Sequence, residues 1–69
     1  MKVSYKPLWH ILVDKDMKKT ALMELAGLST VTMAKLSKGE NVGTGILTKI
    51  CTALNCDISD IVEMLPDSD

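Results

Sequence analysis

The sequence predicts a small all-α protein of five helices folded as one domain, residues 1–69. Apolar residues make up 46% of the chain but aromatic residues only 3%, so aliphatic side chains must supply the buried surface, which favours packed helices. Apolar residues recur three and four positions apart along most of the chain. Glycine, serine and asparagine interrupt this pattern. They are typical of helix ends, and they are spaced about one short helix apart.

The chain opens with residues 1–6, which we expect to form an N-terminal arm. Val3 and Tyr5 alternate there with polar residues, as in a short extended segment. Pro7 suits the first turn of a helix, where its missing N–H has no partner to lose. The first helix therefore starts at Pro7 and ends in the charged run 14–16. Its apolar side chains share one face: Leu8, Ile11 and Leu12.

The second and third helices form a predicted helix-turn-helix. The second covers 18–26, and Gly27 stands where helices often end in the left-handed conformation. Ser29 is suited to cap the third helix, 30–38, which Gly39 closes. The apolar residues of the second helix are Leu22, Leu25 and Ala26. Those of the third helix are Met33 and Leu36. Two helices joined by so short a turn are what a helix-turn-helix requires.

After a loop, the fourth helix is expected to start near Gly43 or Thr44 and to end at Asn55, a residue that tolerates left-handed angles. Its apolar stripe consists of Ile46, Leu47, Ile50, Cys51 and Leu54. Asp57 can cap a last short helix. The residues of that helix expected to return to the core are Ile58, Ile61, Val62 and Leu65. A frayed acidic tail, 66–69, ends the chain.

The reactive side chains suggest no catalytic, cofactor or metal site. Cys51 and Cys56 are five positions apart, which matches neither a redox pair nor zinc-ligand spacing, so we expect buried free thiols. The single histidine, His10, has no partner triad and is expected at or near the surface. Trp9 lies about 100° from the apolar stripe of its helix, which leaves two readings, a rim of the core or a self-association surface. We expect no enzyme activity and no small-molecule ligand.

The net charge of −1 is unevenly distributed. The first 49 residues hold all eight lysines and four acidic residues, whereas the last 20 hold five acidic residues and no lysine. A basic binding face with an acidic far side and a solvated acidic tail beside a mildly basic body fit this distribution equally. No apolar run approaches the roughly 20 residues that span a bilayer, and no signal sequence opens the chain. We therefore expect a soluble cytoplasmic protein without a membrane partner.

The segments "MKKTALMELAGLSTVTMAKLSKGE" and "ILTKICTALNCDISDIVEML" resemble the phage repressor and Cro family of helix-turn-helix transcription regulators, often called XRE-type. The similarity runs from about Leu8 to Leu65. It is carried by the turn glycine, the leucine and serine after it, the two inward residues and closing glycine of the third helix, and the Leu-Asn-Cys-Asp-Ile ending. The resemblance implies a compact five-helix repressor-like DNA-binding domain whose third helix lies in the major groove of double-stranded DNA.

The resemblance also implies roles for particular residues. Lys19 matches a position at the start of the second helix that meets a phosphate. The positions that face base edges, with the cap before them, are Ser29, Thr30, Val31, Thr32 and Lys35. The positions that grip the backbone at and after the end of the third helix are Lys38, Asn41 and Thr44. A homodimer is expected, at least on DNA, with the last helices, the acidic end or the arm with Tyr5 and Trp9 as candidate dimer surfaces.

Three departures from the family pattern bear on function. Lys18 stands where the second helix usually has a Ser or Thr cap. Met23 replaces a small alanine, so it either widens the approach of the second and third helices or folds into the gap. The third helix has no Arg, Gln or Asn for two-pronged base contacts. We expect a DNA-binding repressor without an effector domain, and the alternative is a protein-interaction module on the same fold, antitoxin-like or an anti-repressor.

Overall fold

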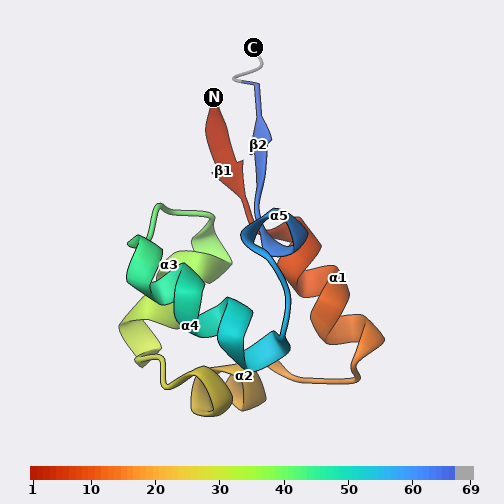
Figure 1. Ribbon diagram of the computed structural model, residues 1–69. Coiled ribbons are helices and arrows are strands. Elements are labelled where there is room, and N and C mark those ends of the chain that lie inside the picture. Colours follow the sequence, from red (N-terminus) through yellow and green to blue (C-terminus); the bar gives the residue numbers. More distant parts are fainter. Residues whose placement is uncertain (67–69) are drawn as a thin grey trace.

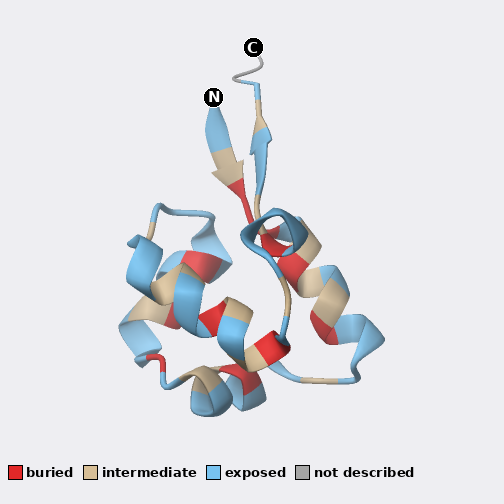
Figure 2. Ribbon diagram, viewed as in Figure 1, coloured by how far each residue is buried: buried red, intermediate tan, exposed pale blue. Residues whose placement is uncertain are grey.

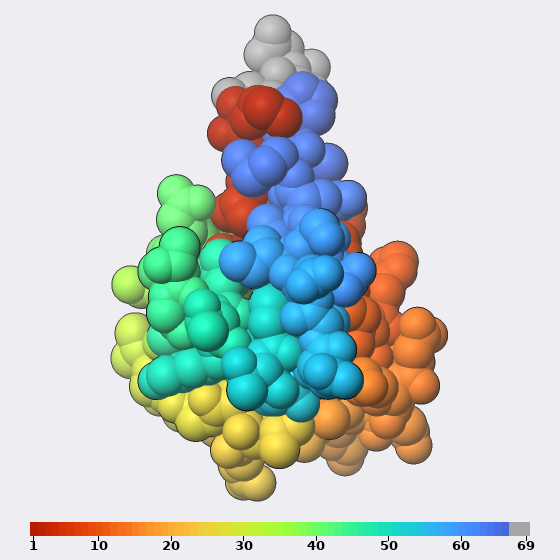
Figure 3. Space-filling view, viewed as in Figure 1, coloured from red at the N-terminus to blue at the C-terminus, as the bar shows by residue number. Residues whose placement is uncertain are grey.

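A computed structural model describes residues 1–66, which form five helices and two short strands (Figure 1). In chain order these elements are β1 Lys2–Ser4, α1 Lys6–Asp14, α2 Lys19–Ala26, α3 Thr30–Lys38, α4 Thr44–Leu54, α5 Ile58–Ile61 and β2 Glu63–Leu65. Helix α1 packs against α5, α2 packs against α4 and α3, and α4 also contacts α5. The strands β1 and β2 form an antiparallel ribbon that projects from the helices (Figures 1 and 3).

Each helix contributes one fully buried aliphatic side chain to the core. These five residues are Leu8, Leu22, Leu36, Ile50 and Ile61. The buried sites in Figure 2 lie on the inner faces of the helices, and every helix also has exposed positions. Removing these side chains from water is the main force that holds such short helices together, because isolated helices of this length are unstable.

The predicted helix boundaries are confirmed at most ends. Gly27, Gly39 and Asn55 all adopt the left-handed conformation, with φ of 69°, 75° and 54°. The Ser29 side chain accepts a hydrogen bond from the Thr32 backbone N–H at 3.1 Å and so caps α3. Asp57 is the N-cap of α5, and its backbone N–H donates to the Asp60 carboxylate at 3.0 Å. Local side-chain chemistry therefore determines where these helices begin and end.

The prediction for the end of the chain was wrong. The last helix stops at Ile61, and Val62 is already extended, with φ −126° and ψ 138°. Residues Glu63–Leu65 then form β2 and pair with β1 in the register Lys2 with Leu65, Val3 with Met64 and Ser4 with Glu63. Ile58 is 46% exposed rather than buried. The backbone groups of β1 supply hydrogen-bond partners that a continued helix would not have used. Of the predicted tail, residues 67–69 lie outside the described part.

The N-terminal arm is also shorter and better anchored than expected. Helix α1 begins at Lys6, so only residues 1–5 precede it, and three of these form β1. Tyr5 is buried, with 3% of its surface exposed, because it lies at the junction of the strand and the helix. A buried side chain is not available to a second molecule, so the expected part of Tyr5 in a dimer surface is wrong.

Four further side chains, those of Leu25, Cys51, Cys56 and Trp9, bear on the predicted burial. Leu25 was predicted in the apolar stripe of α2 but is 57% exposed, because the packing of α2 engages Leu22 instead. The two cysteines are free thiols as expected, but both are half-buried rather than buried. Trp9 is half-buried and packs against the core, which places it at the rim.

Candidate nucleic-acid interface

Helix α3 presents two chemically different faces. Met33 and Leu36 fix the inner face in the core. On the outer face Val31 is 65% exposed, and Lys35 is exposed one turn further along. Thr30 and Lys38, at the two ends of the helix, are exposed as well. No residue of this helix is acidic, so the exposed charges of the helix are the two lysines, beside one large exposed apolar side chain.

Two hydrogen bonds join Ser29 and Thr32 in the first turn of α3. The Ser29 hydroxyl donates to the Thr32 hydroxyl at 3.0 Å, in addition to accepting the Thr32 backbone N–H. Thr32 is half-buried, whereas Thr30, two positions earlier, is exposed. Among the predicted base-facing residues, Thr30, Val31 and Lys35 are thus accessible, and Ser29 and Thr32 hold the turn that presents them.

The N-termini of α2 and α4, like that of α1, have no side-chain cap. The N-cap of α2 is Lys18, as the sequence predicts, and that of α4 is Gly43, which has no side chain. The first N–H groups of a helix carry a partial positive charge and lack partners within the helix, so an uncapped start is suited to an anion. Asn41 and Thr44, the predicted backbone-contact residues beside the start of α4, are both exposed.

Lys19, at the start of α2, makes two contacts within the protein. Its Nζ lies 4.4 Å from the centroid of the Trp9 ring. The same Nζ donates a hydrogen bond to the Ser37 hydroxyl of α3 at 3.3 Å. The ammonium group therefore joins three helices while remaining on the surface, and it is not neutralised by either neutral partner.

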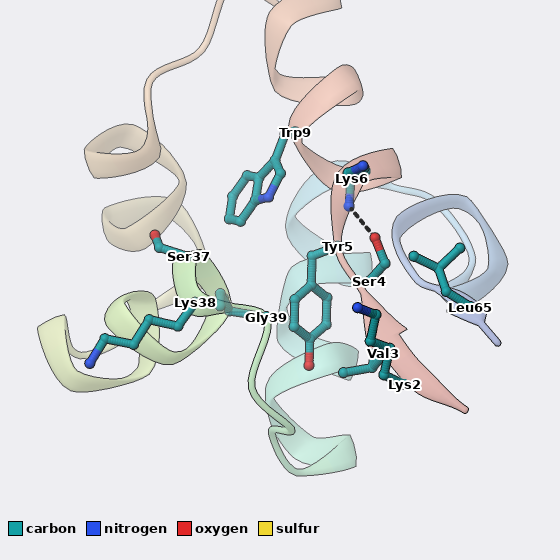
Figure 4. Close-up of a pocket in the computed structure, with 11 residues that line it drawn as sticks. Lys2, Val3, Ser4, Tyr5, Lys6, Trp9, Ser37, Lys38, Gly39 and Leu65 are labelled. Carbon is teal, nitrogen blue, oxygen red and sulfur yellow. Dashed lines mark hydrogen bonds between the residues drawn. The ribbon is translucent and has the colours of Figure 1, made fainter. Parts of the chain in front are cut away.

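A cleft of about 410 Å³ lies between β1, the start of α1 and the end of α3 (Figure 4). Figure 4 shows the Tyr5 and Trp9 rings within it, Ser37 and Lys38 on one side, and Lys2 and Val3 on the other. Three lysines line the cleft, Lys2, Lys6 and Lys38, and no carboxylate is found among the described residues that line it. In a chain with net charge −1, this local excess of positive charge favours anions on this side.

Tyr5 fixes the loop that follows α3. Its hydroxyl donates to the Glu40 carbonyl oxygen at 2.8 Å across 35 positions of sequence. Burial raises the pKa of the Tyr5 hydroxyl above its ordinary value of 10.0, because the phenolate would be poorly solvated there. This bond connects the loop that contains Asn41 to the start of α1.

Three observations concern possible metal ligands, the reactivity of the thiols and the length of the helices. Within residues 1–66 no three His, Cys, Asp or Glu side chains lie close enough together to hold a metal ion. Burial, followed by the neighbouring Cys51, raises the pKa of the Cys56 thiol, which lowers its reactivity. In the same part of the chain none of the helices has the length and apolar character that spanning a bilayer demands.

A helix-turn-helix whose second helix presents exposed lysines on its outer face is characteristic of a class of DNA-binding proteins. The Cro/C1-type HTH DNA-binding domain family matches residues 7–67, and the chain belongs to this family, whose role is DNA-binding transcription regulation. It is similar to the crystal structure of the transcriptional regulator VanUg, with 53% identity and a TM-score of 0.92, over 96% of this chain and 88% of that one. No curated protein matches the chain.

The structure brings the predicted residues together only in part. Thr30, Val31 and Lys35 are all exposed on α3. Asn41 lies in the loop that follows this helix. Lys19 instead lies against Trp9 and Ser37, at the far end of α3 from Ser29. Sequence reasoning missed this cluster because Trp9 and Lys19 meet only through the packing of separate helices. The one sequence signal for this cluster was that Trp9 lies off the apolar face of its helix.

Proposed function

We propose that this protein is a sequence-specific transcriptional repressor that reads the major groove of DNA with α3 as a homodimer. The observation that carries the proposal is the outer face of α3, where Val31 and Lys35 are exposed one turn apart and no acidic residue is present. A lysine can donate to guanine O6 or N7, and a valine can pack on the methyl group of thymine. The core contacts of Met33 and Leu36 hold this face outward.

The uncapped helix starts and the lysines around α3 supply the contacts with the DNA backbone in this proposal. The first amides of α4, at Thr44, bind one phosphate, and Lys38 and Asn41 contact the backbone beside it. Such contacts set the position of α3 in the groove without selecting a base sequence. The absence of Arg, Gln and Asn from α3 reduces direct readout, so the shape of the DNA contributes to specificity.

Dimerisation follows from the small size of the reading surface. One helix in one groove contacts too few base pairs for a unique site, whereas two copies related by a two-fold axis read half-sites about 34 Å apart. Occupation of a promoter by such a dimer denies the same base pairs to other proteins. Repression is therefore the direct consequence of binding, and a promoter fused to a reporter should lose activity when the protein is supplied.

A salt titration of DNA affinity tests the proposal against a protein-interaction role on the same fold. We expect the affinity for duplex DNA to fall steeply as salt rises, because several phosphates release counterions on binding. Lys38→Ala should weaken all sequences about equally and lower the slope of log K against log salt by about one. The matched control is Lys15→Ala, which removes the same charge from the turn after α1. If the protein does not bind duplex DNA, or if its affinity does not depend on salt, the protein-interaction role is favoured.

Sedimentation of the protein on a bound duplex tests the dimer. Two protein chains per duplex at saturation are expected for a site that contains both half-sites. A duplex with one half-site should bind a single chain more weakly, which serves as the control. A one-to-one complex at saturation on the full site would contradict the dimer. It would not contradict base reading by α3, which requires a separate test.

A further inference from the structure

Trp9 is the single tryptophan of the chain, and it packs at the rim of the core rather than inside it. It is half-buried at the rim, on α1, which lies outside the helix-turn-helix. The Lys19 ammonium sits over its ring at 4.4 Å, within the range of a cation–π interaction. On its other side Nζ is bonded to the Ser37 hydroxyl at 3.3 Å. Two neutral groups from two helices therefore hold one cation between them.

This arrangement leaves the ammonium group able to bind an anion. An ammonium has three N–H donors, and the hydroxyl of Ser37 uses one of them. Lys19 is an exposed residue, so an anion can still reach its ammonium group. A carboxylate partner would have neutralised the lysine, but the ring and the hydroxyl orient it and leave its charge intact. A lysine otherwise samples many rotamers and loses that freedom when it binds.

We propose that Trp9 and Ser37 are positioning residues that hold the Lys19 ammonium for a phosphate of the DNA backbone, an inference that rests on the proposed DNA-binding function. The ordering of Lys19 precedes binding, so less conformational entropy is lost when the phosphate arrives. The neighbouring cleft with Lys2, Lys6 and Lys38 adds positive charge on the same side, and no carboxylate lines it to compete for the cation (Figure 4). The contact with the backbone thus extends from the helix-turn-helix to α1.

The test measures duplex affinity against salt for Lys19→Ala, Trp9→Leu and Ser37→Ala, with Lys15→Ala as the control for charge. Lys19→Ala should lower the salt slope by about one and the affinity on the order of eightfold near 0.1 M salt, because one phosphate contact is lost. Trp9→Leu removes the ring but keeps the cation, so affinity should fall about two- to fivefold. Ser37→Ala should weaken binding in the same direction, and Lys15→Ala should change the slope less than Lys19→Ala.

A double-mutant cycle separates positioning from a structural role. In the Lys19→Ala background, Trp9→Leu should have no further effect on affinity, because the ring then has no cation to hold. Trp9→Phe keeps an aromatic face and should recover most of the affinity lost in Trp9→Leu. Circular dichroism establishes that each variant is folded. If Trp9→Leu does not fold, the cycle is completed with Trp9→Phe and with Ser37→Ala, each measured alone and in the Lys19→Ala background.

Two outcomes overturn the inference without touching the proposed function. In the first outcome, wild-type protein binds DNA with a steep salt dependence and Lys19→Ala has the same salt slope. Lys19 then contacts no phosphate. Alternatively, the loss caused by Trp9→Leu and by Ser37→Ala is the same with and without Lys19, in which case neither residue acts through it. Wild-type protein that does not bind duplex DNA contradicts the proposed function itself, and the inference with it.

Discussion

At the scale of single residues, Tyr5 links two parts of the chain that are far apart in sequence. Its buried hydroxyl connects the start of α1 to the Glu40 carbonyl in the loop after α3. Tyr5→Phe keeps the ring and removes the hydrogen bond, so the free energy of unfolding at neutral pH should fall by about 0.5–1.5 kcal/mol. Urea denaturation followed by circular dichroism measures this loss. An unchanged midpoint would mean that the bond to Glu40 does not form in solution.

The pH dependence of the same residue has a definite sign. Burial raises the pKa of Tyr5 in the folded state above 10.0, so the folded protein favours the neutral phenol. Its contribution to stability is complete below pH 10 and is lost as the pH rises through the folded-state pKa. Wild-type stability should therefore fall more steeply above pH 10 than that of Tyr5→Phe. Parallel curves for the two proteins above pH 10 would contradict a buried, neutral Tyr5.

At the scale of elements, the start of α3 depends on Ser29. Its hydroxyl caps the helix and also bonds to Thr32. Ser29→Ala should reduce the free energy of unfolding by about 0.5–2 kcal/mol, because an orphan N–H loses its acceptor. Ser59→Ala, at an exposed position inside α5, is the matched control and should change stability little. Equal stabilities for Ser29→Ala and wild type would show that water replaces this cap without cost.

The elements that could be predicted are those whose boundaries depend on neighbouring residues. Gly27, Ser29, Gly39 and Asn55 mark helix ends through their own backbone and side-chain preferences, and all four are confirmed. The strand β2 was predicted as helix because its partner, β1, lies some 60 positions away and leaves no periodic signal in so short a segment. The same reason explains why the meeting of separate helices at Lys19 was not foreseen.

At the scale of the whole molecule, buried side chains from all five helices form the core that holds the fold together. Ile50 on α4 is completely buried, and α4 contacts both α2 and α5. Ile50→Ala should cost about 2–5 kcal/mol of the free energy of unfolding, through lost burial and the cavity that remains. In a domain of this size that is a large part of the total. Thermal melting measures it, with Thr52→Ala at an exposed position of the same helix as the control.

An unchanged melting curve for Ile50→Ala would show that the inner face of α4 is wrongly assigned. The fold then would not present α3 as described, because Leu36 of α3 is part of the same buried cluster. Stability and DNA reading are coupled through this core. Variants meant to test the outer face of α3 should therefore be confirmed as folded before their binding is compared.

The central claim is that the outer face of α3 reads bases, and selection of binding sites from random duplexes tests it most directly. Wild-type protein should select two related half-sites about 34 Å apart. Lys35→Ala should cost about 1–3 kcal/mol on that site and lose preference at one base position per half-site, whereas Lys38→Ala should select the same sequence with lower affinity. If folded Lys35→Ala and Val31→Ala proteins both select the wild-type sequence with undiminished preference, α3 does not read the DNA.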